Sequence, residues 1–118
     1  MWGLSQHHVE QIIQLFQRTP EIDEAYLFGS RALGNFSQGS DVDIVLKGPH
    51  LTHRIVSDLS VYLNEETNMP YHFDLLLYAS IQNTDLIAHI NRVGVLLYAK
   101  VKVAIAQEPP TSYSPDES

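Results

Sequence analysis

The chain has 118 residues, of which 44% are hydrophobic, and its seven Lys or Arg against fourteen Asp or Glu give a net charge of −7. This length predicts one domain with a single core and excludes a separate substrate domain. The absence of cysteine excludes disulfides and thiolate metal sites. The acidic balance argues against a duplex-DNA binder, whose affinity would come mainly from Lys and Arg.

The longest apolar runs, such as residues 93–99, are far shorter than the roughly 20 residues that span a bilayer. The first residues also lack the charged and apolar regions of a secretory signal. We therefore expect a cytoplasmic protein whose partners include neither a membrane nor a long nucleic acid.

The first elements are a helix and a strand. Apolar residues recur at helical spacing after Ser5, which predicts an N-capped helix of about three turns that ends before Pro20. Residues 24–28 are short, apolar and partly aromatic, and they run into Gly29 and Ser30. This pattern predicts a strand that enters a tight turn.

Residues 41–46 predict a second strand, which closes at a Gly-Pro pair. Side chains alternate between the two faces of a strand, so Asp41 and Asp43 share one face while Val42 and Ile44 share the other. The sequence therefore predicts a pair of carboxylates on one side of the sheet.

A long amphipathic helix capped by Thr52 and ending near Asn68 follows, and then a third strand over residues 71–78. Asp74 lies inside this strand, on the face opposite its apolar residues 73, 75 and 77. Strands disfavour Asp, and a buried unpaired carboxylate is costly, so Asp74 calls for a functional explanation.

The end of the chain predicts a shorter helix capped by Asn83 or Thr84, Gly94 as its terminator, and a last edge strand over 95–98. Residues 107–118 are rich in Pro, Ser and Glu and hold too little apolar surface to fold. We expect a disordered tail there.

The three aspartates suggest a metal site. Carboxylates at positions i and i+2 of a strand start roughly 7 Å apart on one face, so Asp41 and Asp43 can converge on one hard cation. Asp74 from a neighbouring strand would complete a site for Mg²⁺, which takes a few carboxylates, waters and phosphate oxygens. Two such ions would activate a hydroxyl and neutralise a leaving pyrophosphate.

The turn after the first strand suits a phosphate group. Gly29 allows close approach of the backbone, and Ser30 offers a hydroxyl and can cap a short helix that starts near Arg31. The chain contains no Gly-Lys-Ser/Thr, which excludes a Walker P-loop, and no dinucleotide fingerprint.

Together these motifs resemble the DNA polymerase β-type nucleotidyltransferase superfamily. Leu-Phe-Gly-Ser-Arg-Ala-Leu-Gly precedes Gly-Ser-Asp-Val-Asp-Ile, and ten residues separate Ser30 from Asp41. The order of elements agrees over roughly residues 5–98. The resemblance implies an α/β (α+β) nucleotidyltransferase fold, a small mixed sheet with helices mainly on one face and the active site on the other.

Within that superfamily the short chain resembles the minimal nucleotidyltransferases (MNT), which are commonly encoded beside HEPN-domain proteins as antitoxins of toxin–antitoxin pairs. The resemblance implies one MNT domain over residues 1–106. It also implies that Asp41 and Asp43 are paired metal ligands and that Asp74 is the third, which accepts the proton of the attacking hydroxyl.

The same resemblance implies ATP as substrate and two Mg²⁺ ions as cofactor. Gly29 and Ser30 would hold the triphosphate, and the Arg31 guanidinium would contact a phosphate. AMP would pass to a tyrosine of a HEPN ribonuclease toxin and so neutralise it.

Two other interpretations stay open. In the first, the chain is a non-catalytic antitoxin that acts by binding the HEPN toxin. In the second, it is a nucleotidyltransferase that modifies a small molecule. The intact set of three aspartates argues against the first, because a dead site is free to lose a carboxylate. The lack of an acceptor-binding domain argues against the second.

Overall fold

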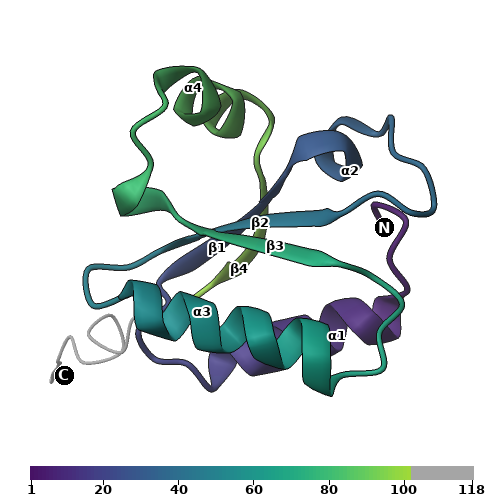
Figure 1. Ribbon diagram of the computed structural model, residues 1–118, viewed down its shortest axis with the longest axis horizontal. Coiled ribbons are helices and arrows are strands. Elements are labelled where there is room, and N and C mark those ends of the chain that lie inside the picture. The colour runs from purple at the N-terminus through teal and green to yellow at the C-terminus, as the bar shows by residue number, and fades with distance from the viewer. Residues whose placement is uncertain (102–118) are drawn as a thin grey trace, which may run out of the picture.

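The computed structural model describes residues 1–101 (Figure 1). Its elements in chain order are α1 (Gln6–Gln17), β1 (Glu24–Phe28), α2 (Gly29–Leu33), β2 (Val42–Lys47), α3 (His53–Val61), a π-helical turn (Tyr62–Glu66), β3 (Phe73–Leu77), a 3-10 turn (Tyr78–Ser80), α4 (Thr84–Val93) and β4 (Val95–Ala99). The order of helices and strands is the one that the sequence predicts, whereas the π-helical turn and the 3-10 turn were not predicted. The predicted disordered tail, 107–118, lies outside the described residues, as does the end of the predicted domain.

The four strands form one mixed sheet in the order β3-β2-β1-β4. β1 pairs antiparallel with both β2 and β4, whereas β2 and β3 run parallel. Parallel neighbours need a crossover, and α3 supplies it (Figure 1). The predicted α/β fold with a small mixed sheet is confirmed.

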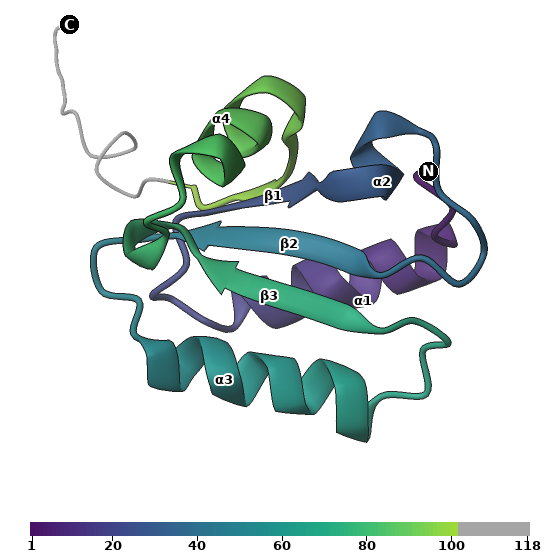
Figure 2. The same cartoon turned by 45° about the horizontal axis from the view of Figure 1, so that its top comes forward.

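The helices divide between the two faces of the sheet, with α1 and α3 on one side and α2 and α4 on the other (Figure 2). Val42, Ile44 and Leu46 of β2 point into the main core, which α1 and α3 cover. The helices α1 and α3 therefore share one face, as expected, whereas α2 and α4 lie on the opposite face (Figure 2). On the opposite face, Ile90 of α4 packs over Val45, so that α4 covers part of the side that carries the aspartates.

Side-chain caps fix where the longer helices begin. Ser5 accepts from a backbone N–H of the first turn of α1, and Thr52 does the same for α3. Asn83 rather than Thr84 caps α4, with its Oδ1 accepting from two backbone N–H groups. Over residues 1–101, no helix is both long enough and apolar enough to cross a membrane.

Candidate active site

Asp43 and Asp74 lie directly opposite one another in the parallel pairing of β2 and β3. Both point to the face opposite the main core, since the neighbours of each in its own strand are buried in that core. Asp43 is half-buried and Asp74 is exposed. The structure therefore places these two predicted site residues side by side.

Gly29 stands against the carboxylate of Asp43. Its φ of +76° is one that glycine adopts readily, and a Cβ at this position would overlap Oδ2 of Asp43. The turn from β1 into α2 thus places the Gly-Ser pair directly beside the carboxylate of Asp43. No other residue type fits there without displacing Asp43.

The short helix α2 begins at Gly29, two residues earlier than a cap at Ser30 requires. Phe28 is the N-cap, and it makes no side-chain capping hydrogen bond. The prediction that Ser30 caps this helix is therefore wrong. Ser30 instead lies inside its first turn, where its carbonyl accepts from the backbone N–H of Gly34 at 2.9 Å.

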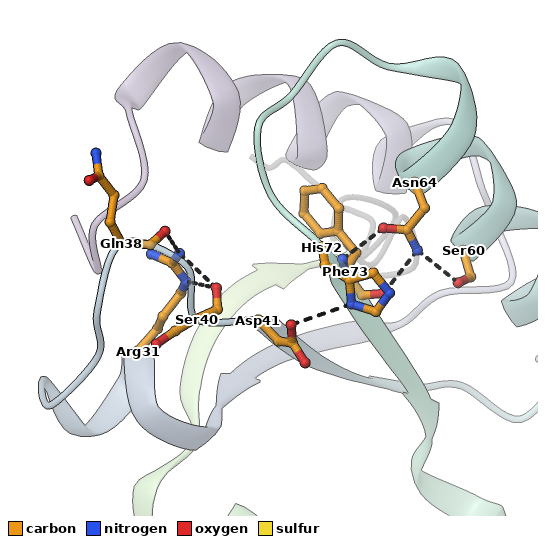
Figure 3. A network of polar contacts seen from close by, with 8 residues as sticks. All are labelled: Arg31, Gln38, Ser40, Asp41, Ser60, Asn64, His72 and Phe73. Carbon is orange, nitrogen blue, oxygen red and sulfur yellow. Dashed lines mark hydrogen bonds and ion pairs between the residues drawn. The ribbon is translucent and has the colours of Figure 1, made fainter.

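Asp41 lies just before β2 and is directed toward His72 (Figure 3). Oδ1 of Asp41 is 3.5 Å from Nδ1 of His72, and both side chains are largely exposed. The N–H of Val42 also donates to the His72 carbonyl at 2.8 Å, which fixes this register. Sequence reasoning missed His72, although its position two residues before Asp74 matches that of Asp41 before Asp43.

The aspartates interact electrostatically. The pKa of Asp43 is raised from 3.8 to about 6, first by burial and then by the negative charges of Asp74 and Asp41, while the positive charges of Arg31 and His72 act in the opposite direction. Like charges held close together favour the protonated form, and a bound cation relieves that repulsion.

The Arg31 side chain does not make the contacts that were predicted for it. Only 1% of the residue is exposed, and its guanidinium donates four hydrogen bonds to three backbone carbonyls, those of Ser40, Gln38 and Trp2. Four of its five donors are therefore occupied within the protein. This geometry does not agree with a phosphate contact and indicates that Arg31 organises the loop before Asp41 (Figure 3).

The donor set fits a hard divalent cation in its chemistry, because carboxylate oxygens are the ligands that Mg²⁺ takes from proteins. In the part of the chain that the structure describes, no three His, Asp or Glu side chains converge on one point. Asp41 faces His72 instead. A site with all three aspartates thus requires the Asp41 side chain to turn away from that partner.

The protein family described as Polymerase beta, Nucleotidyltransferase matches residues 10–102. The chain belongs to this nucleotidyltransferase family. The match includes the Gly-Ser turn, the Asp-Val-Asp segment and Asp74. Among curated proteins, no match to this nucleotidyltransferase was found.

Solved structures share the fold. One chain of a toxin–antitoxin crystal structure with AMP-PNP has a TM-score of 0.64 at 22% identity, with 82% of this chain and 75% of that one covered. One chain of a structure of the tri-AMPylated Shewanella oneidensis HEPN toxin in complex with MNT antitoxin has a TM-score of 0.62 at 23% identity, covering 82% and 74%. One chain of the crystal structure of the toxin–antitoxin MntA-HepT has a TM-score of 0.61 at 23% identity, with 81% of this chain and 74% of that one covered.

Proposed function

We propose that this nucleotidyltransferase is an Mg²⁺-dependent antitoxin that transfers AMP from ATP to a tyrosine hydroxyl of a HEPN ribonuclease toxin. The observation that carries the proposal is the facing pair Asp43 and Asp74 beside Gly29, in a chain of the polymerase beta family. The likeness of its fold to toxin–antitoxin chains, one of them in complex with an AMPylated HEPN toxin, supports the choice of partner.

In this proposal Asp41, Asp43 and Asp74 hold the metal, and Gly29 and Ser30 hold the triphosphate. When bound, Mg²⁺ would neutralise the charge on the phosphates and favour departure of pyrophosphate. The close contact of Gly29 with Asp43 supports this arrangement, because a triphosphate at the Gly-Ser turn would lie next to the carboxylates.

The transfer is a substitution at the α-phosphorus of ATP. The acceptor oxygen forms a bond to that phosphorus, the bond from phosphorus to the bridging oxygen breaks, and pyrophosphate leaves. Asp74 takes the proton of the attacking hydroxyl. Its carboxylate is exposed, so that an acceptor side chain from outside the chain has access to it. Positioning and charge neutralisation then account for catalysis.

A protein acceptor agrees with the exposed position of Asp74, whose carboxylate a hydroxyl of another protein can reach. A HEPN protein encoded by the neighbouring reading frame is the acceptor to test.

The test uses ATP labelled at its α-phosphate, Mg²⁺, the full chain and that HEPN protein. We expect label on the HEPN protein and a matching loss of its ribonuclease activity, with neither when Mg²⁺ is omitted. Inhibition of the ribonuclease without label would overturn the proposal in favour of an antitoxin that acts by binding. Label on an aminoglycoside, with none on the HEPN protein, would favour a small-molecule enzyme.

A further inference from the structure

Arg31 is a buried cation without a carboxylate partner among residues 1–101, where no Asp or Glu oxygen lies within 4.0 Å of it. Burying a charge is costly unless hydrogen bonds compensate for it. Here the compensation comes from three carbonyls and from two aromatic rings, with the guanidinium carbon 5.2 Å from the ring centre of Phe36 and 5.5 Å from that of Tyr71. These contacts hold the Arg31 side chain in one position relative to the three carbonyls and the two rings.

The carbonyls on one side of Arg31 belong to the loop that delivers Asp41. The Ser40 carbonyl accepts from Nε at 3.1 Å and from Nη2 at 2.8 Å, and the Gln38 carbonyl accepts from Nη2 at 3.4 Å. Ser40 is adjacent to Asp41, and Arg31 is adjacent to Ser30. The side chain therefore sets the spacing between the Gly-Ser turn and the first aspartate (Figure 3).

The carbonyl on the other side belongs to the N-terminal hook, residues 1–4. The Trp2 carbonyl accepts from Nη1 at 3.0 Å, and Trp2 itself has a positive φ of 55°, which is uncommon outside glycine. Gly3 follows at φ +76°, where a Cβ would overlap both the Phe36 ring and Nη1 of Arg31. The hook is thus held in an unusual backbone conformation against the guanidinium.

We propose that Arg31 is a positioning residue through which the N-terminal hook holds the loop 37–41, and with it Asp41, in place beside the Gly-Ser turn. The catalytic consequence rests on the proposed function, whereas the structural coupling does not. The hook is then a part of the active-site scaffold, although it supplies no group to the reaction.

Gly3→Ala tests the coupling, with Gly34→Ala as its matched control. Both glycines have a positive φ, but a Cβ at Gly34 meets nothing within 4 Å. Two readouts are independent of activity. They are the emission of Trp2, the sole tryptophan of the chain, and the amide hydrogen exchange of residues 37–41. We expect both to change in Gly3→Ala and neither in Gly34→Ala.

Arg31→Lys provides a second variant if Gly3→Ala fails to fold, since it keeps the charge but loses the planar fork. Its control is Arg54→Lys, at a side chain that is 86% exposed. We expect faster exchange over 37–41 and a kcat lower by about 10²-fold, the loss that a small misplacement of catalytic groups causes, with the KM for ATP changed far less. Arg54→Lys should match the wild type.

The outcomes separate the two proposals. If the wild type transfers no AMP, the proposed function fails, while exchange and Trp2 emission still decide the coupling. Unchanged exchange at 37–41 in a folded Arg31→Lys or Gly3→Ala protein overturns the coupling even when transfer is robust. A kcat loss of similar size in Arg54→Lys would also overturn it.

Discussion

Asp43 of β2 and Asp74 of β3 are register partners on adjacent parallel strands, so that two carboxylates stand side by side on one face of the sheet. Nothing in a stable core requires this arrangement, because like charges on neighbouring strands are destabilising. The molecule tolerates that cost beside the Gly29 turn, where the same pair is suited to a cation and a triphosphate.

The free energy of unfolding of the metal-free protein should show the cost of placing Asp43 beside Asp74. The pKa of Asp43 is raised from 3.8 to about 6, so between these values the folded state binds more protons than the unfolded chain. The free energy of unfolding therefore falls as the pH rises through this window and stays lower above it. Asp43→Asn removes this loss. We expect it to be more stable than the wild type at pH 7.5 by about 1 kcal/mol after solvent screening, with no such gain near pH 4.

Urea denaturation in the presence of EDTA measures this difference at both pH values. Asp58→Asn is the control, because that carboxylate is exposed and pairs only weakly with Arg54, 3.6 Å away. A gain at pH 7.5 that is equal in both variants would indicate a general effect of net charge and would contradict the specific role of Asp43.

Gly29→Ala should damage the site itself. The added Cβ meets Oδ2 of Asp43, and the positive φ adds strain of about 1–2 kcal/mol. We expect a loss of stability larger than that of Gly34→Ala, where only the strain applies, together with weaker binding of Mn²⁺ and ATP. Thermal unfolding and calorimetric titration measure the two effects, and equal behaviour of the two variants would refute the contact with Asp43.

Features that depend on residues close together in the sequence could be predicted, whereas most contacts between residues far apart in the sequence could not. Period-two alternation was enough to place Asp41 and Asp43 on one face, and local capping signals located the starts of α1 and α3. The sequence also predicted that Asp74 joins this pair from a neighbouring strand. The exact register that sets Asp74 opposite Asp43 was beyond sequence reasoning, since it depends on how the α3 crossover places β3.

Arg31 and His72 show the same limit. The partners of Arg31 are backbone carbonyls up to 29 residues away. Every residue has a backbone carbonyl, so the sequence does not indicate which of them accept a hydrogen bond from Arg31. His72 meets Asp41 only because two strands enter the sheet in parallel. For Ser30 the local pattern itself misled, because the helix already begins at Gly29, which has a positive φ, two residues earlier than a serine cap implies.

Asn64 should matter for the placement of Asp74. Its Oδ1 accepts from the N–H of Phe73 at 2.8 Å and its Nδ2 donates to the Phe73 carbonyl at 2.9 Å, which ties the start of β3 to the π-helical turn. Asn64→Ala leaves both backbone groups unpaired, and we expect a loss of about 1–3 kcal/mol in chemical denaturation. Asn68→Ala, at an exposed position, should cost less than about 0.5 kcal/mol. Equal losses would contradict the role of Asn64.

His72→Ala tests the conformational freedom of Asp41. The Asp41–His72 pair is exposed, and such pairs contribute about 0–1 kcal/mol. Its removal frees the carboxylate, so we expect the affinity for Mn²⁺ to rise by up to about fivefold in calorimetric titration. His53→Ala is the control, at an exposed residue of α3. A loss of Mn²⁺ affinity in His72→Ala would mean instead that His72 is itself needed for the metal.

The central claim is that the three aspartates carry the transfer of AMP. Its most direct test is mass spectrometry of the neighbouring HEPN protein after incubation with ATP, Mg²⁺ and either the wild type or the Asp41→Ala/Asp43→Ala double variant, whose fold is checked by circular dichroism. We predict an adenylate on a HEPN tyrosine with the wild type and none with the folded double variant. An adenylate added equally well by the double variant would contradict the claim.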